Sequence, residues 1–135
     1  MNDFNHSIIE EFHANGGKVG GPFEGIPLLL LTTTGAKSGK QRINPVAFTT
    51  DDERLVIVAS KNGAPTHPDW YHNIVAHPDV TVEVGTDTFA ARTTVVDGAE
   101  RDKLFASMAA MIPVYAEYQA QITRTIPVVV LTRKD

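Results

Sequence analysis

The chain has 135 residues, and its 16 acidic side chains outnumber the 12 Lys and Arg residues to give a formal net charge of −4. This length fits one domain, and a composition of 42% hydrophobic and 21% charged residues is typical of a soluble globular protein. The absence of cysteine excludes disulfides, thiolate metal sites and cysteine nucleophiles, and the acidic balance argues against a nucleic-acid binder. The longest apolar run, residues 26–31, is too short for a transmembrane helix, and no secretory signal pattern stands at the start. We therefore expect a cytoplasmic protein.

The first segment has the periodicity of an amphipathic helix. Apolar residues recur there at helical spacing: Phe4, Ile8, Ile9 and Phe12. The Gly16-Gly17 pair then supplies a C-terminal stop. This pattern predicts an N-terminal helix within residues 1–17, followed at residues 20–25 by a turn-rich connector in which neither helix nor strand is favoured.

The next part of the sequence has the composition of β-strands. Three strands are predicted, separated by polar turns at residues 35–40 and 51–53: residues 27–34, 42–49 and 55–59. Because the turns are short, we expect an antiparallel meander. Pro45 lies inside the second strand and cannot donate to a ladder, so it marks an edge strand, a bulge or a ligand-facing backbone.

Helices and strands alternate in the remainder of the chain. A short helix is expected with Pro68 as its first residue, Thr66 or His67 as its cap, and an end near Pro78. The other expected elements are strands at residues 80–84, 89–96 and 126–131, a helix at residues 99–111, and a helical segment led by Pro113. Six strands with helices inserted among them predict an α+β protein built on a small antiparallel barrel. We expect a single domain, in which residues 18–135 form the barrel and residues 1–17 the N-terminal helix.

Familiar catalytic and binding motifs are matched only superficially. Residues 35–41, Gly-Ala-Lys-Ser-Gly-Lys-Gln, have one residue too few between the glycines for a P-loop, and they join two strands rather than a strand and a helix. His67, His72 and His77 are five residues apart, so a helix would not place them on one face to bind a metal ion. Ser60 has no glycine two residues away, as a nucleophile elbow would require. A triad of Ser60, a histidine and Asp69 stays open, but nothing specific favours it.

Positive charge is concentrated in one part of this acidic chain. Lys37, Lys40 and Arg42 fall within six residues with no acid among them, and Lys61 follows the third predicted strand. Lys and Arg around a backbone turn can bind an anion such as a phosphate. Hairpin tips are also commonly rich in Lys for solubility and edge protection, and charge alone favours this second interpretation.

Three blocks of the sequence together resemble the deazaflavin (coenzyme F420)-dependent nitroreductase family. Residues 29–42, LLLTTTGAKSGKQR, look like the family's signature hairpin. Residues 58–73, VASKNGAPTHPDWYHN, resemble its second block, which Ala76-His77-Pro78 continues, and residues 113–119, PVYAEYQ, resemble its third. The blocks occur in the family's order and at similar spacing between Pro27 and Leu131.

The resemblance implies a split β-barrel that binds coenzyme F420, a deazaflavin carrying a phosphodiester and an acidic polyglutamate tail. It assigns the phosphate and tail to the basic residues Lys37, Arg42 and Lys61, assisted by the turn amides of Ala36 to Ser38. It places small and apolar residues along the flat ring, with Pro45, Val46 and Ala47 on one wall and Ala59 and Ser60 on another. The helix begun at Pro68 and Asp69 would close the pocket with Trp70 and Asn73, and Trp70 could equally be a core aromatic.

The resemblance also implies the reaction. The reduced deazaflavin would give a hydride to an electron-poor acceptor such as an enone, a quinone or a nitro compound, while the protein supplies orientation, shelter from water and a proton. Ser60 matches a family position that hydrogen-bonds the acceptor, and Tyr115 and Tyr118 match tyrosines that shape the acceptor pocket, so these three are the expected catalytic residues. Ile112 stands where some nitroreductase-active members have another tyrosine.

Other interpretations stay open at this point. A barrel of this kind could bind FMN as a reductase or oxidase, or could carry F420 without turnover. No metal ligand set and no nucleic-acid partner are expected. The sequence leaves open a monomer or a homodimer, and a peripheral contact with a membrane, although Glu10 and Glu11 give the N-terminal helix no basic face.

Overall fold

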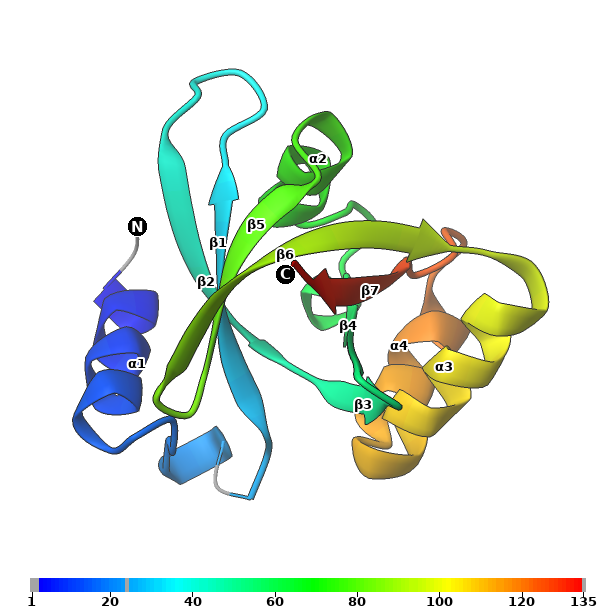
Figure 1. The fold of residues 1–135 in the computed structure, drawn as a ribbon. Coiled ribbons are helices and arrows are strands. Elements are labelled where there is room, and N and C mark those ends of the chain that lie inside the picture. The colour runs from blue at the N-terminus through cyan, green and yellow to red at the C-terminus, as the bar shows by residue number, and fades with distance from the viewer. Residues whose placement is uncertain (1–2, 24, 135) are drawn as a thin grey trace.

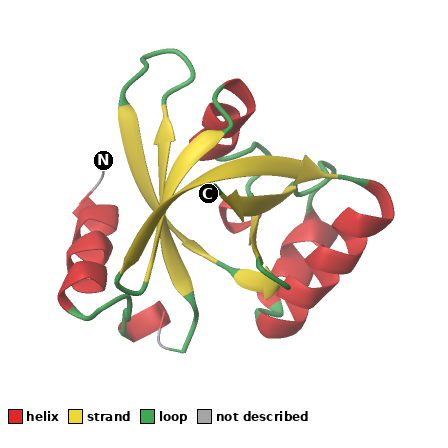
Figure 2. Cartoon of the chain, viewed as in Figure 1, coloured by secondary structure: helices red, strands yellow, loops and turns green. Residues whose placement is uncertain are grey.

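The computed structural model describes residues 3–23 and 25–134. Within these ranges the chain forms four α-helices, two short 3₁₀ helices and seven strands (Figures 1 and 2). The helices are α1 (Asp3–Ala14), α2 (Asp69–Ala76), α3 (Gly98–Met111) and α4 (Val114–Gln121), with η1 (Gly21–Phe23) and η2 (Lys61–Gly63) as 3₁₀ helices. The strands are β1 (Leu28–Thr34), β2 (Gln41–Ala47), β3 (Thr49–Asp51), β4 (Arg54–Val58), β5 (Asp79–Val84), β6 (Asp87–Val96) and β7 (Val128–Arg133). The predicted α+β class is confirmed.

All seven strands belong to one curled antiparallel sheet. Their order is β2-β1-β5-β6-β7-β4-β3, so the two ends of the sheet are strands that follow each other in the chain and are separated only by Phe48. In Figure 1 the long strand β6 sweeps from the half of the molecule that holds β1, β2 and β5 to the half that holds β7, β4 and β3. The sheet is therefore an open barrel whose two halves are joined by β6.

The predicted three-stranded meander is wrong in its last pairing. The expected strand at residues 42–49 is split at Phe48 into β2, which pairs with β1, and β3, which pairs with β4. The other neighbour of β4 is β7, and the observed strands number seven rather than six. The backbone amide of Phe48 donates to the carbonyl oxygen of Pro27 at 3.1 Å, which holds the crossing between the two halves. Pro45 lies opposite Leu30 in β2 at the end of the sheet, as the edge interpretation expects.

The helices cover the sheet with apolar faces. Trp70 and Ile74 of α2 are buried against β1 and β4, and Phe105 and Met108 of α3 are buried against the half of the sheet that contains β4 and β7. Most of the predicted N-terminal stripe is confirmed by the burial of Ile8, Ile9 and Phe12, while the side chain of Phe4 lies outside the described residues. None of the described helices has both the length and the apolar character needed to cross a membrane.

Two local predictions differ from the structure. Pro68 is the cap that precedes α2, with a ψ of 156°, and Asp69 is the first helical residue. Proline fits this position because it precedes the helix, where no helical hydrogen bond requires the backbone N–H that proline lacks. The connector at residues 20–25 was expected to lack regular structure, but Gly21 to Phe23 form a single 3₁₀ turn.

Candidate functional site

Two pockets lie beside β2 and the start of α2. The first, here called the apolar pocket, is a cavity of 360 Å³ whose walls come from β2, the end of β4, α2 and α4. The second, here called the basic pocket, has 970 Å³ and lies between the β1–β2 turn and α2. Asn44 lines the basic pocket and Pro45 the apolar one, while Asp69 lines the basic pocket between the apolar-pocket residues Pro68 and Trp70. Each pocket thus takes neighbouring residues from the same two segments, so one elongated ligand could occupy both.

Flat and small side chains form one side of the apolar pocket. Pro45, Val46 and Ala47 reach it from β2, and Trp70 closes it from α2. Trp70 is only 7% exposed and packs into the main core, so it is a core aromatic that also lines this pocket. A wall of this kind suits a planar aromatic ligand, because no long side chain projects from it.

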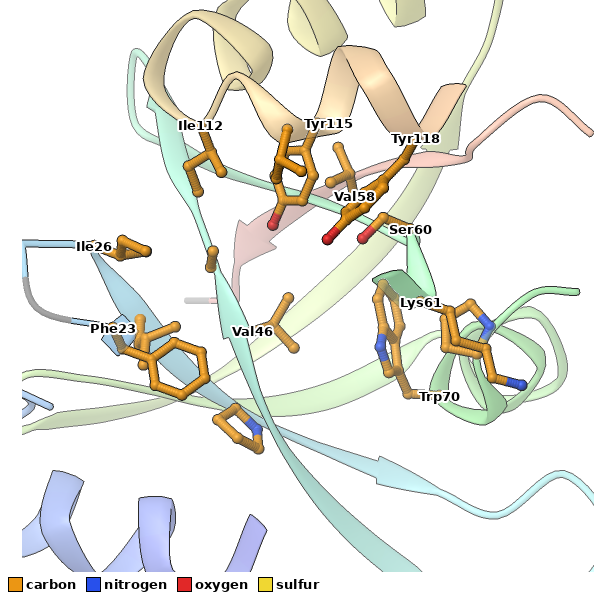
Figure 3. Close-up of a pocket in the computed structure, with 15 residues that line it drawn as sticks. Phe23, Ile26, Val46, Val58, Ser60, Lys61, Trp70, Ile112, Tyr115 and Tyr118 are labelled. Atoms are coloured by element: carbon orange, nitrogen blue, oxygen red, sulfur yellow. The ribbon is translucent and has the colours of Figure 1, made fainter. Parts of the chain in front are cut away.

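Three hydroxyl groups face the apolar pocket from the other side. Figure 3 shows the oxygens of Ser60, Tyr115 and Tyr118 pointing into the same space above Val46 and Trp70. Ser60 caps η2 through its backbone, and its side chain makes no capping hydrogen bond. Burial raises the pKa of Tyr115, and the neighbouring Tyr118 adds to the shift, so the Tyr115 phenol stays protonated at neutral pH. The pocket therefore combines apolar walls with groups that can donate a proton or a hydrogen bond.

The turn that follows Ser60 has an unusual backbone. Lys61 has a φ of +48°, in the left-handed region that a residue with a Cβ seldom adopts. Its ammonium donates to Oγ1 of Thr66 at 3.2 Å. Gly63 has a φ of +78°, and a Cβ on it would lie 2.7 Å from Cδ1 of Tyr118. Only glycine fits there, so η2 and α4 pack closely enough to bring Ser60 and Tyr118 together.

The basic pocket is built from the β1–β2 turn on one side and α2 on the other. Lys37 and Arg42 line it from the hairpin and are exposed, while Asp69 and His72 line it from the helix. In the described part of the chain, the backbone amides of Lys37 and Ser38 have no hydrogen-bond partner, so both can donate to a ligand. Two exposed cations beside free amides form a surface that can bind an anion.

The structure brings most of the predicted site residues together in these two pockets. Those lining the apolar pocket are Pro45, Val46, Ala47, Ser60, Lys61, Trp70, Tyr115 and Tyr118. Those lining the basic pocket are Ala36, Lys37, Ser38, Arg42, Asp69 and Asn73. The one predicted residue that lines neither is Ala59, which is fully buried in the main core.

Two further placements bear on the expected roles. Lys61 lines the apolar pocket, whereas Lys37 and Arg42 line the basic pocket, and its predicted part in holding the phosphate and tail stays a prediction. The amide of Ala36 is already bonded to Oδ1 of Asn73 at 3.0 Å, so of the three turn amides only those of Lys37 and Ser38 are available.

Sequence reasoning missed several residues of the site. Phe23, Ile26 and Val58 line the apolar pocket, and Arg124 hydrogen-bonds the backbone behind Ser60. Apolar pocket walls have the same sequence pattern as core residues, so no signal marked the first three. Arg124 lies alone in the polar segment Thr123-Arg124-Thr125, and its contacts are with residues about 60 positions away in the chain.

Known proteins resemble this chain over most of its length. An F420H(2)-dependent quinone reductase of Mycobacterium tuberculosis is 37% identical over 129 residues, which cover 91% of this chain and 85% of that protein. A second protein of the same organism, described in similar words, is 33% identical over 109 residues, covering 78% of this chain and 89% of its own length.

Solved structures agree with the observed fold. An F420-H2 dependent reductase is 40% identical with a TM-score of 0.72, over 78% of this chain and 93% of that one. A domain-swapped dimer is 35% identical with a TM-score of 0.75, over 96% of this chain and 97% of that one. An FAD-binding protein of Mesorhizobium loti, 13% identical with a TM-score of 0.56 over 81% of this chain and 80% of that one, shares the fold alone. These neighbours have split-barrel folds, and the predicted split β-barrel is confirmed.

A family model identifies the whole barrel. The model described as F420H(2)-dependent quinone reductase matches residues 6–133. Its description contains reduced coenzyme F420, so the cofactor predicted from the sequence is confirmed at the level of the family. The resemblance of the three sequence blocks to deazaflavin-dependent reductases is confirmed in the same way. The chain belongs to the family of F420H(2)-dependent quinone reductases.

Proposed function

We propose that this chain transfers a hydride from reduced F420 to a quinone, with enones and nitro compounds as further classes of acceptor. One observation carries the proposal: three hydroxyl groups face an apolar cavity that adjoins a pocket lined by Lys37 and Arg42. A flat redox ring and an acidic tail are joined in F420, and the two pockets offer a separate environment for each.

The residues present fit both parts of the cofactor. A deazaflavin ring needs apolar walls that it can approach closely, and Pro45, Val46, Ala47 and Trp70 provide them. The phosphodiester and acidic tail need cations and free N–H donors, which Lys37, Arg42 and the amide of Ser38 provide in the basic pocket. We assign the holding of the cofactor to these residues.

Reduced F420, when bound, supplies a hydride, and reduction of a quinone to a hydroquinone takes that hydride together with a proton. Ser60, Tyr115 and Tyr118 are the groups of this chain that can hydrogen-bond the acceptor oxygen and pass a proton to it. Burial raises the pKa of Tyr115 above its ordinary value, so its phenol is protonated in the neutral range and can donate a hydrogen bond to the acceptor. The expected catalytic residues thus act on the acceptor, and the cofactor carries the redox chemistry.

Apolar side chains complete the acceptor side of the cavity. Phe23, Ile26 and Ile112 line it, and none of them offers a polar group. Such a lining excludes water from the reacting atoms and suits the flat apolar body of a quinone. Because Ile112 is apolar, it adds no further hydroxyl group to those of Ser60, Tyr115 and Tyr118.

The experiment is a rate measurement with purified protein, reduced F420 and a panel containing a naphthoquinone, a cyclic enone and a nitroaromatic compound. Loss of reduced F420 that depends on both protein and acceptor, and is fastest with the quinone, supports the proposal. Tight binding of F420 without turnover of any acceptor overturns it in favour of a carrier protein. Turnover limited to the enone or the nitro compound keeps the reductase and overturns the quinone assignment.

A further inference from the structure

Arg124 reaches back from the loop between α4 and β7 to a distant stretch of backbone. Its Nε donates to the carbonyl oxygen of Ala64 at 3.0 Å, Nη1 donates to that of Ala59 at 3.1 Å, and Nη2 donates to that of Ser60 at 2.7 Å. Nη1 also lies 3.0 Å from Nδ1 of His67. Among the described residues Arg124 has no carboxylate partner, so its charge is satisfied by carbonyl oxygens and one imidazole. Burial lowers the pKa of Arg124.

The segment bound by Arg124 carries Ser60 into the apolar pocket. Strand β4 ends at Val58, and the amide of the next residue, Ala59, donates a hydrogen bond to the carbonyl oxygen of Pro127. Two hydrogen bonds then close the turn: the amide of Gly63 donates to the carbonyl oxygen of Ser60, and the amide of Ala64 donates to that of Lys61. The carbonyl of Ser60 therefore accepts from both the Gly63 amide and the Arg124 guanidinium. Because a guanidinium is rigid and planar, donation to three carbonyls of one segment fixes the orientation of the peptide planes around Ser60.

Arg124 is itself held in place by α4. The side chain of Gln119 donates through Nε2 to the carbonyl oxygen of Arg124 at 2.8 Å and accepts through Oε1 from the amide of Ile126 at 2.8 Å. The same Oε1 accepts from Nη2 of Arg101 at 2.8 Å, which ties the loop to α3 as well. Helix α4 also carries Tyr115 and Tyr118. One hydrogen-bond network thus connects the helix that bears the tyrosines to the turn that bears Ser60.

We propose that Arg124 is a positioning residue for hydride transfer: it fixes the Ser60 hydroxyl relative to Tyr115 and Tyr118, although it lines neither pocket. The inference rests on the proposed function, in which Ser60 meets the acceptor. A purely structural Arg124 would stabilise the barrel without any special relationship to Ser60. The two roles therefore differ in whether the effect of losing Arg124 depends on the presence of the Ser60 hydroxyl.

The kinetic test is a double-mutant cycle with Arg124→Met, Ser60→Ala and the double variant. The matched control is Arg54→Met, because Arg54 is also partly buried but pairs with Asp51 and Glu100 on a different part of the molecule. We expect Arg124→Met to lower kcat at least about tenfold with the F420 dissociation constant changed by less than about threefold, and Arg54→Met to change neither. In the Ser60→Ala background Arg124→Met should have almost no further effect on kcat.

Equal loss of kcat in the two backgrounds, or no loss at all, would overturn the positioning role. Arg124→Lys is the second variant, because lysine keeps the positive charge but cannot donate hydrogen bonds to all three carbonyl oxygens in the same planar arrangement. It should fall between the wild type and Arg124→Met in kcat, with an unfolding midpoint near that of the wild type. An intermediate kcat with lysine supports positioning through the three carbonyl oxygens, whereas full activity with lysine would overturn it.

Amide hydrogen exchange supplies a readout that needs no turnover. In Arg124→Met the amides of Gly63 and Ala64 should exchange at least about tenfold faster relative to amides in β1 and β5, and Arg54→Met should leave this ratio unchanged. Unchanged exchange at these two amides would overturn the role of Arg124. If the wild type fails to oxidise reduced F420, the proposed function fails instead, while faster exchange in Arg124→Met would still support the hold of Arg124 on the Ser60 turn.

Discussion

The side chain of Asn73 joins α2 to the β1–β2 hairpin: Oδ1 accepts from the amide of Ala36 at 3.0 Å, and Nδ2 donates to Oγ1 of Thr33 at 3.1 Å. Asn73 is buried, and the two elements that it joins form opposite sides of the basic pocket. The buried amide group of Asn73 therefore adds two hydrogen bonds to the apolar packing that holds the helix beside the hairpin. We therefore expect replacement of Asn73 to lower both the stability of the protein and its affinity for F420.

Replacing Asn73 with Ala should lower the free energy of unfolding by about 1–3 kcal/mol, because the part-buried amide of Ala36 and the buried hydroxyl of Thr33 lose their partner. It should also weaken F420 binding, since the hairpin is no longer tied to α2. Thr33→Val is the graded control, because it removes the Nδ2 bond and leaves the bond to Ala36. Urea unfolding and F420 titration of both variants check this, and equal F420 affinity in the two variants would contradict the role given to the Ala36 bond.

Replacing Lys37 or Arg42 with Ala should each weaken F420 binding by about 1.5 kcal/mol, the lower end for a hydrogen bond to a charged group, because both side chains are exposed. Lys40→Ala is the matched control: Lys40 is an exposed lysine of the same turn that does not line the basic pocket. The wild-type affinity should fall with added salt, and less steeply in the two variants. Loss of affinity of the same size in all three variants would mean that general charge, and not the pocket, attracts the tail.

Ser60→Ala should lower turnover about a hundredfold, at the low end of the contribution of a positioned proton donor, with F420 affinity nearly unchanged. The reason is that the Ser60 hydroxyl faces the cavity while its side chain takes no part in capping η2. Steady-state kinetics with the quinone and a separate F420 titration measure the two quantities. A large loss of F420 affinity would contradict this separation of roles.

Gly63→Ala should destabilise the protein more than Gly98→Ala. Both glycines have positive φ, +78° and +58°, so alanine is strained at each by about 1–2 kcal/mol. A Cβ at Gly98 meets nothing within 4 Å, whereas one at Gly63 would lie 2.7 Å from Cδ1 of Tyr118. Thermal unfolding compares the two, and turnover should fall only in Gly63→Ala because Tyr118 must move. Equal behaviour of the two variants would show that the packing of Gly63 against Tyr118 is unimportant.

Stability should decrease as the pH falls below the ordinary histidine pKa, in part because of His67. Burial lowers the pKa of His67, with further contributions from Arg124 and His72, so the unfolded chain binds a proton at a higher pH than the folded one. The contribution of His67 is therefore complete above pH 6.5 and is lost as the pH falls through the lower folded value. His67→Asn should reduce this pH dependence in urea unfolding, and the exposed His77→Asn should not. A slope that His67→Asn leaves unchanged would contradict the assignment.

The fold could be predicted from the sequence wherever local patterns decide it. The stripe of Ile8, Ile9 and Phe12, the alternation of β5 and the glycine-bounded hairpin turn all appear in the structure near the expected positions. The pairing of β4 could not be predicted. Closure of the barrel moves the chain from one end of the sheet to the other at Phe48, and no glycine, proline or polar turn marks that residue.

The same distinction between local sequence patterns and tertiary contacts applies to the site residues. Lys37, Arg42 and Trp70 belong to contiguous blocks that carry a family pattern, and the structure places them around the two pockets. Arg124 binds the backbone carbonyl oxygens of Ala59, Ser60 and Ala64. Because every residue has a backbone carbonyl group, the sequence does not indicate which residues Arg124 binds. A residue that positions others through their backbone becomes visible only when the fold is known.

The choice of F420 as cofactor is tested by a side-by-side fluorescence titration of the wild-type protein with oxidised F420 and with FMN at moderate salt. We expect saturable binding of F420 in about the micromolar range, roughly −8 kcal/mol, and much weaker binding of FMN, which lacks the acidic tail that the basic pocket is expected to hold. Preference for FMN, or failure to bind either compound, would contradict it.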